Sequence, residues 1–230
     1  MSTLLCIETS GAICSIAWVE DGEVIHSIEK HEKNSHSKYL SVMIDDLFSK
    51  VGAHARSALD GIGLSLGPGS YTGLRIGASV AKGLAFALDI PIVGMHSTDI
   101  MCSAFLADHP GFEGLVCPMI DARRMEVYAS VYDQSMNENL ELQPLILDSD
   151  SLLEFRHATE LVFVGDGSAK FKEVCQLENA RFVDEEYLLA KNMAALATGQ
   201  FESKNFLDTA YFEPNYLKEF MIVKSKKKLF

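Results

Sequence analysis

The sequence is short of basic residues. It has 20 Lys and Arg against 32 Asp and Glu, which gives a formal net charge of −12. Proteins that grip nucleic acid directly neutralise its phosphates with clustered cations, so we expect any nucleic acid to contact a partner protein instead. The one basic run, formed by Lys224, Lys226, Lys227 and Lys228, predicts a solvated C-terminal tail.

Long hydrophobic runs are also missing. No stretch of about 18 consecutive apolar residues occurs, and the first residues carry no basic segment, so we expect neither a membrane span nor a signal peptide. The five cysteines lack C-x-x-C spacing, which favours buried thiols in a reducing compartment. They are Cys6, Cys14, Cys102, Cys117 and Cys175. These absences together predict a cytoplasmic protein.

The histidines do not have the spacing of metal ligands. None of the seven pairs with another at i, i+4, the spacing that puts two imidazoles on one face of a helix. Surface histidines explain all of them, and we predict no metal site.

The chain does have enough apolar material for a real core, at 48% hydrophobic over 230 residues. Apolar runs at residues 4–7, 14–19 and 24–28 predict a hairpin followed by a third strand. Apolar residues at i, i+3, i+4, i+7 and i+11 predict a helix over 40–51, which Gly52 ends. A second helix is expected over 72–88.

The second half of the chain repeats the first in outline. Glu8 and Asp121 each end an apolar strand, and a G-x-G-S turn follows an apolar strand at Gly67 and again at Gly165. This pattern predicts an internal duplication in which two α/β halves face each other across a cleft. We expect an N-terminal α/β domain with partner-binding helices at 1–108, a C-terminal α/β domain at 109–215 and a basic tail at 216–230.

The densest chemical pattern is the glycine turn that begins at Gly67. It brings the N–H groups of a helix start, two hydroxyls and a guanidinium together, which suits an anion or phosphate. An equally weighted alternative is a tight strand-to-helix turn capped by Ser70 or Thr72. The residues of the predicted anion or nucleotide loop are Glu8, Gly67, Gly69, Ser70, Thr72 and Arg75.

Two other patterns each have a plain alternative. Glu8 and Asp121 could hold a hydrated Mg²⁺ against a nucleotide, or each could satisfy its own hairpin turn. Ser65 stands in a G-x-S-x-G sequence, the nucleophile motif of α/β-hydrolases. That motif needs its serine on an exposed turn, whereas Ser65 has the surroundings of a strand residue, so a serine hydrolase is disfavoured.

The helix expected over 72–88 is apolar around most of its girth. A ridge of Gly and Ala at every fourth position allows another helix to approach closely. Such a helix needs a second neighbour besides its own sheet, supplied by the 40–51 helix or by a partner protein. The residues expected at the partner surface are Leu40, Met43, Leu47, Gly73, Gly77, Ala81, Leu84 and Ala85.

The run G-P-G-S-Y-T-G-L-R-I-G at residues 67–77 resembles the signature of the TsaB (YeaZ) family. The sequences I-E-T-S at 7–10, G-L-A-F-A-L-D-I-P at 83–91, D-A-R-R-M-E-V-Y at 121–128 and G-D-G at 165–167 resemble the same family. Its members are the dimerisation subunits of the bacterial complex that synthesises threonylcarbamoyladenosine (t6A) in tRNA. Glu8 stands where Asp is common and Met125 where Gly is common, which weakens the expectation of tight nucleotide binding.

The resemblance implies an α/β, actin-like (ASKHA, RNase H-like) fold of two duplicated domains. It also implies a catalytic paralogue, TsaD, as partner, which transfers a threonylcarbamoyl group to N6 of adenosine 37 in tRNAs that read ANN codons. A third component, the ATPase TsaE, supports turnover. We further expect a homodimer when the chain is alone, contact with tRNA only through the complex, and no cofactor of its own, with ATP or ADP at the complex interface.

The resemblance also indicates that this chain does not perform the transfer. The paralogue holds a metal with H-x-x-x-H, and alignment on Asp89-Ile90-Pro91 puts those two positions at Ser97 and Met101. Neither side chain replaces an imidazole on a catalytic metal. The main alternative is a free-standing ATP-dependent small-molecule kinase of the actin-like fold, and a metal-dependent peptidase is a weaker one.

Overall fold

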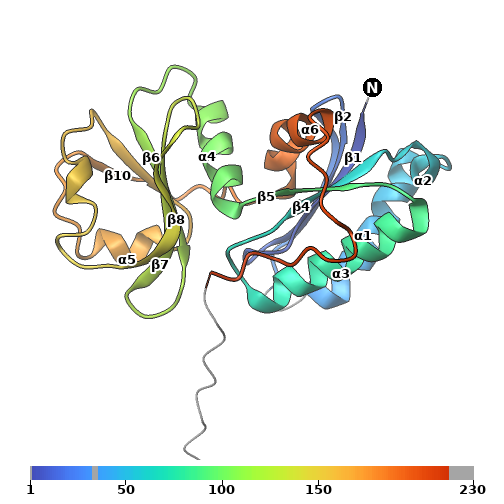
Figure 1. Ribbon diagram of the computed structural model, residues 1–230, viewed down its shortest axis with the longest axis horizontal. Coiled ribbons are helices and arrows are strands. Elements are labelled where there is room, and N and C mark those ends of the chain that lie inside the picture. The colour runs from blue at the N-terminus through green and yellow to red at the C-terminus, as the bar shows by residue number, and fades with distance from the viewer. Residues whose placement is uncertain (1, 33–35, 218–230) are drawn as a thin grey trace, which may run out of the picture.

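The computed structural model describes residues 2–32 and 36–217, which form two α/β halves joined side by side (Figure 1). The predicted tail at Lys224 to Lys228 lies outside the described residues. In the part that is described, no helix is both long and apolar enough to cross a membrane.

The first half contains a five-stranded sheet with the order β3-β2-β1-β4-β5. Its strands are β1 (Thr3–Glu8), β2 (Cys14–Glu20), β3 (Glu23–Lys30), β4 (Gly61–Ser65) and β5 (Ile92–Met95). The first three strands form an antiparallel meander, and β4 and β5 run parallel to β1. The predicted hairpin and third strand are confirmed.

The second sheet repeats this topology, with the order β8-β7-β6-β9-β10. Its strands are β6 (Leu115–Asp121), β7 (Glu126–Asp133), β8 (Glu138–Ile146), β9 (Leu161–Val164) and β10 (Ala180–Phe182). Again three antiparallel strands are followed by two parallel ones. The internal duplication predicted from the carboxylate and glycine patterns is confirmed.

Most helices belong to the first half or to its junction with the second. They are α1 (His36–Val51), α2 (Ala55–Ala58), α3 (Tyr71–Leu88), α4 (Ser97–Asp108), α5 (Ser168–Lys172) and α6 (Ala194–Glu202), with short 3-10 turns η1 (Leu153–Phe155) and η2 (Ala190–Met193). Gly52 ends α1 as expected: its φ is +118° and its N–H donates to the Phe48 carbonyl at 3.0 Å. Glycine adopts this left-handed backbone without a steric penalty.

The two faces of the first sheet are covered by different parts of the chain. Because side chains alternate along a strand, Leu5 and Ile7 of β1 pack under α1 and α3, whereas Leu4 and Cys6 face η2 and α6. Residues 190–202 therefore return to the N-terminal sheet. The segment expected to form one C-terminal domain, 109–215, is divided between the two sheets.

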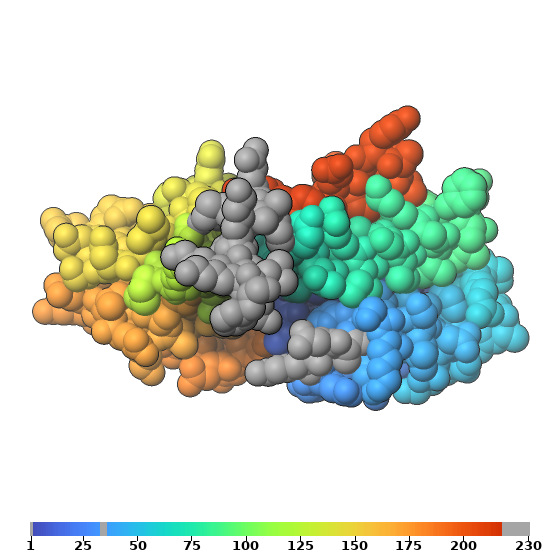
Figure 2. All heavy atoms as spheres, turned by 90° about the horizontal axis from the view of Figure 1, so that it is seen from below, coloured from blue at the N-terminus to red at the C-terminus, as the bar shows by residue number. Residues whose placement is uncertain are grey.

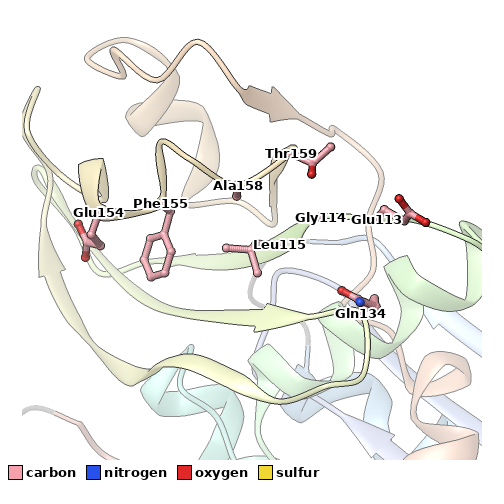
Figure 3. A pocket seen from close by; sticks show the side chains of 8 residues that line it. All are labelled: Glu113, Gly114, Leu115, Gln134, Glu154, Phe155, Ala158 and Thr159. Atoms are coloured by element: carbon pink, nitrogen blue, oxygen red, sulfur yellow. The ribbon is translucent and has the colours of Figure 1, made fainter.

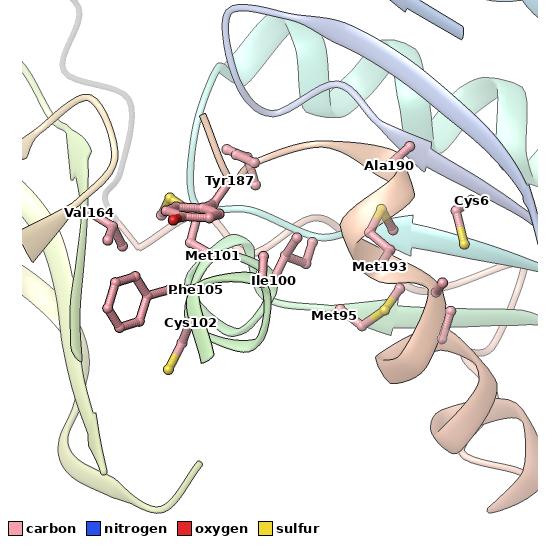
Figure 4. Close-up of a cluster of buried hydrophobic side chains, with 14 of the residues drawn as sticks. Cys6, Met95, Ile100, Met101, Cys102, Phe105, Val164, Tyr187, Ala190 and Met193 are labelled. Carbon is pink, nitrogen blue, oxygen red and sulfur yellow. The ribbon is translucent and has the colours of Figure 1, made fainter. Parts of the chain in front are cut away.

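Helix α4 joins the halves. Its Met101 and Phe105 are buried between the second sheet, where Val164 lies, and the segment that carries Tyr187 (Figure 4). The Phe105 ring contacts Tyr187 edge-on, with ring centroids 6.0 Å apart. A single apolar cluster therefore spans both halves.

Removing the Phe105 ring tests this joint. Phe105→Ala should lower the free energy of unfolding by about 3–5 kcal/mol, because it opens a cavity in the shared cluster. Phe86→Ala is the matched control: its ring is 88% exposed, and the change should stay within about 0.5 kcal/mol. Denaturant titration measures both. Equal effects would show that α4 does not hold the halves together.

Candidate functional site

Three serine hydroxyls meet where β1, β4 and β5 end. Ser10 follows β1, Ser65 ends β4 and Ser97 begins α4 after β5. The Ser97 Oγ lies 2.8 Å from the Ser10 Oγ and 3.0 Å from the Ser65 Oγ, and all three residues are buried. The carboxyl ends of the strands are where open α/β sheets place their ligand sites, but here the hydroxyls satisfy one another.

Ser65 is therefore no hydrolase nucleophile. It is the last residue of β4, it is buried, and the hydrogen-bond partners of its hydroxyl are serines. A nucleophile elbow would expose this oxygen on a turn and pair it with an imidazole.

Glu8 is completely buried beside the serine cluster. Its carboxylate accepts hydrogen bonds from the Ser10 N–H, from the Ser10 Oγ at 2.5 Å and from the Gly11 N–H at 3.2 Å. Burial raises the pKa of Glu8 to about 7, and these hydrogen bonds oppose that rise. The carboxylate thus satisfies its own hairpin, the alternative to a role in holding Mg²⁺.

Asp121 does the same in the second half. Its Oδ1 accepts from the Arg123 N–H at 2.5 Å and from the Lys170 Nζ at 2.9 Å. Desolvation alone would raise the pKa of Asp121, but the hydrogen bonds from Lys170 and from the Arg123 N–H, together with the charges of these two residues, hold the pKa below its usual value. Among the residues that the structure describes, no group of three or more His, Cys, Asp or Glu is placed to hold a metal ion.

The glycine turn is used as a helix cap. The Ser70 Oγ accepts from the Gly73 N–H at 3.2 Å, and the Ser70 N–H donates to the Ser10 carbonyl at 2.7 Å. Arg75 points elsewhere: its Nε donates to the Tyr216 hydroxyl at 3.3 Å. Glu8, Ser70 and Arg75 each make a different internal contact, and the anion or nucleotide loop stays a prediction.

The glycines of this region allow α3 to lie directly against the β1–β2 loop. A Cβ on Gly73 would lie 2.0 Å from the Thr9 carbonyl oxygen, and one on Gly77 would lie 2.3 Å from the Thr9 Oγ1. Thr9 Oγ1 also donates to the Gly73 carbonyl at 2.9 Å. The small ridge therefore packs inside the chain.

The residues expected at the partner surface lie mostly in the interior of the chain for the same reason. Seven of the eight are buried within the chain and the eighth is half-buried, because α1 and α3 pack on each other and on the sheet. The buried residues are Leu40, Met43, Leu47, Gly73, Gly77, Ala81 and Ala85, and the half-buried one is Leu84. The exposed large apolar residues of these helices are instead Val42, Tyr71 and Phe86.

A C-terminal strap, defined here as residues 205–217, crosses α3 and the edge strand β5. The Lys82 Nζ donates to the carbonyls of Ala210 at 3.2 Å and Phe212 at 2.8 Å, and the Leu207 N–H donates to the Ile92 carbonyl at 2.8 Å. Figure 2 shows α1, α3 and the strap as adjacent bands across one end of the molecule. No periodic pattern in the sequence predicted the strap, because its contacts are single hydrogen bonds to residues far away in the sequence.

Tyr211 of the strap is 83% exposed and Phe86 of α3 is 88% exposed. Aromatic side chains are enriched at protein interfaces, where they bury large areas with few rotamers to fix. The strap and α3 together thus present exposed aromatic surface that the sequence analysis did not assign to a site.

Ser97 and Met101, the positions aligned with the paralogue's metal ligands, are both occupied by internal packing. Ser97 belongs to the serine cluster. Met101 is buried, with its Sδ 2.9 Å from where a Cβ on Gly165 would stand. A buried thioether beside a glycine backbone is a poor ligand for a hard or borderline cation.

One open pocket of about 480 Å³ is lined by neither Ser97 nor Met101 (Figure 3). It lies at the start of β6, beside η1, whereas Asp121 ends the same strand. Its lining is Glu113, Gly114, Leu115, Gln134, Glu154, Phe155, Ala158 and Thr159. It contains none of the predicted site residues.

Comparison with known proteins gives consistent results. The family model described as TsaD, tRNA N6-adenosine threonylcarbamoyltransferase, matches residues 23–222. The tRNA threonylcarbamoyladenosine biosynthesis protein TsaB of Haemophilus influenzae is 38% identical over 128 residues, 56% of this chain and 52% of that protein, so the match spans about half of that relative. TsaB of Escherichia coli is 28% identical over 221 residues, 94% of each chain.

The solved structure of YeaZ from Pseudomonas aeruginosa has a TM-score of 0.81 with 27% sequence identity, and covers 94% of this chain and 100% of that chain. Together with the two duplicated sheets, this likeness confirms the expected actin-like fold.

Two glycines of α3 provide a matched test of the contact with the β1–β2 loop. Gly73→Ala should destabilise the fold by at least about 2 kcal/mol, since its Cβ meets backbone at 2.0 Å. Gly83→Ala, with nothing within 4 Å, should stabilise it by about 0.5–1 kcal/mol through helix propensity. Thermal and denaturant unfolding measure both. A neutral Gly73→Ala would mean that the helix does not touch the loop.

The buried Glu8 carboxyl predicts a pH dependence of stability. Its pKa is raised from 4.5 to about 7 on folding, so the protonated form stabilises the native state below about pH 4.5 and this contribution is lost as pH rises through about 7. Glu8→Gln should remove much of this decrease in the free energy of unfolding between about pH 4.5 and pH 7. Burial also raises the pKa values of Asp166 and Glu186, so the variant should retain part of the decrease in unfolding free energy with rising pH. An unchanged curve of unfolding free energy against pH would contradict the assignment.

Proposed function

Because the chain belongs to the family of the tRNA N6-adenosine threonylcarbamoyltransferase TsaD, and within it to the TsaB (YeaZ) proteins, we propose that it is a non-catalytic subunit that binds and supports a catalytic TsaD-type paralogue. In this proposal the paralogue transfers the threonylcarbamoyl group to N6 of adenosine 37 in tRNAs that read ANN codons. The ATPase TsaE is the third component, and the chain acts in t6A biosynthesis.

The serine cluster is the observation that carries the non-catalytic role. An active centre at the ends of β1, β4 and β5 needs polar groups left open to a substrate or a metal. Here the hydroxyls of Ser10, Ser65 and Ser97 hydrogen-bond to one another. Met101, at the second position aligned with the paralogue's metal ligands, is a buried apolar side chain. No general base or nucleophile faces an open site among these residues, so the chain's contribution is to the assembly.

The exposed faces of α1 and α3, together with the strap, are the partner surface in this proposal. The predicted pair of helices is retained, but the contact residues become Val42, Tyr71, Phe86 and Tyr211, the exposed side chains of this region. The same surface forms the homodimer when the paralogue is absent. A standard interface buries roughly 1,600 Å² in total, which two helices and a crossing strap are large enough to supply.

We also propose the cofactor use and the location that were expected from the sequence. The chain holds no cofactor of its own, and ATP or ADP is bound at the interface of the complex, since Ser70 and Arg75 are engaged in internal contacts. The protein acts in the cytoplasm.

Reconstitution tests the proposal. The isolated chain should transfer nothing to tRNA, the paralogue should be poorly active alone, and the mixture with TsaE, ATP and threonylcarbamoyl-adenylate should form t6A. Failure of the chain to co-purify with the paralogue, or equal activity without it, would refute the role. Phosphorylation of a small acceptor by the isolated chain would support the kinase alternative.

The surface has its own test in Phe86→Ser, with Ile146→Ser as control. Ile146 is 72% exposed but lies on β8 of the other half. If Phe86 is a central anchor, its replacement should weaken capture of the paralogue by at least about 30-fold, since a hot-spot side chain contributes about 2 kcal/mol or more. Titration calorimetry measures affinity, and circular dichroism confirms folding. Equal affinities for the two variants would place the interface elsewhere.

A further inference from the structure

The turn between β6 and β7 carries two adjacent arginines. Arg123 and Arg124 are both exposed, and both have left-handed backbone, with φ of 69° and 52°. Neither is a glycine, so this conformation persists only because surrounding contacts hold it. The D-A-R-R-M-E-V-Y sequence that contains them supported the family resemblance, but the pair has no part in the proposed partner surface.

Lys170 of α5 holds this turn in place. Its side chain is 15% exposed, and its Nζ donates to the Asp121 Oδ1 at 2.9 Å, the Arg124 carbonyl at 2.8 Å and the Glu126 carbonyl at 2.9 Å. An ammonium has three protons, and all three are directed at oxygens of the turn. The Lys170 charge therefore neutralises Asp121 and fixes the backbone from which the arginines project.

Neither guanidinium group is held by another side chain, although the Arg123 charge acts on the Asp121 carboxylate and helps to lower its pKa. Each of the chain's other four arginines has a side-chain partner: Arg56 with Asp45, Arg75 with Tyr216, Arg156 with His157 and Arg181 with Glu160. Within residues 2–32 and 36–217, neither Arg123 nor Arg124 makes a side-chain hydrogen bond or ion pair. Two exposed guanidinium groups on a turn that Lys170 holds in place suit a ligand with several phosphate oxygens, because guanidinium binds such oxygens in bidentate fashion.

The turn lies in the half of the molecule that does not carry α1 and α3. In Figure 1 it is the loop at the lower end of the left half, on the same side as the start of α3. A paralogue docked on α1, α3 and the strap would leave this loop accessible to whatever the complex binds next.

We propose that the Arg123–Arg124 turn is a phosphate-binding element that contacts the phosphodiester backbone of the tRNA bound by the complex. The inference rests on the proposed function for its source of phosphate. With a net charge of −12, the chain repels a polyanion at long range, so the turn adds a local contact to a tRNA that its partners hold. Alone, the chain binds RNA weakly, and only at low salt.

The test compares two double variants that remove the same charge from the same half. Arg123→Gln with Arg124→Gln removes the free pair, and Arg156→Gln with Arg181→Gln removes two arginines that already have partners. Amide NMR of the isolated chain at about 10 mM salt, where the Debye length is about 30 Å, detects weak binding of a tRNA transcript. RNA should shift residues 121–126 in the wild type and the control, but not in the Arg123/Arg124 variant.

Other probes separate the sources of the anion. Inorganic pyrophosphate or a polyglutamate peptide that shifts the turn as strongly as RNA, at equal charge concentration, would overturn the RNA assignment. Absence of any RNA-induced shift in the turn would overturn the proposal altogether.

In the assembled complex, loss of Arg123 and Arg124 should lower the slope of log affinity for tRNA against log salt by about 1–2, at about 0.9 per phosphate contact. An unchanged slope would count against the site. Capture of the paralogue should be the same for all variants. A wild-type chain that captures no paralogue would refute the proposed function and leave the NMR result to decide the phosphate site by itself.

Discussion

The close contact between α3 and the β1–β2 loop is the constraint on which most of this structure depends. The helix backbone reaches the Thr9 carbonyl and hydroxyl because Gly73 and Gly77 have no side chain to keep it away. That contact orients Ser10, whose carbonyl accepts from the Ser70 N–H at the start of the same helix. The glycine turn, the buried carboxylate of Glu8 and the serine cluster are thereby held in one packed unit, with little room for a ligand.

This arrangement shows how an actin-like fold can satisfy the polar groups at the ends of its strands with internal partners. Buried polar groups that meet at strand ends need hydrogen-bond partners. Here hydroxyl pairs with hydroxyl and carboxylate pairs with its own hairpin amides. The second half uses a lysine for the same purpose at Asp121. These internal partners are what the proposed assembly role requires of the strand ends.

Features with a local sequence signal could be predicted from the sequence. The hairpins, the helix ended by Gly52 and the duplicated strand-to-turn patterns depend on residues a few positions apart, which periodicity and turn chemistry report. Which face of α3 is buried could not be derived, because a helix apolar around its girth has no single inner side. The meeting of Ser10, Ser65 and Ser97, and the return of residues 190–217 to the first sheet, depend on contacts between distant positions. Only the folded chain brings them together.

That return also sets the order in which the protein can be completed on the ribosome. The first sheet is synthesised early, but the residues that cover Leu4, Cys6 and Val93 on one face, and the strap along β5, are among the last to emerge. Until then an apolar sheet face and an unpaired strand edge stay open, the two features through which growing chains aggregate. The N-terminal half is therefore a discontinuous folding unit, and a fragment that stops at residue 108 is expected to need a chaperone.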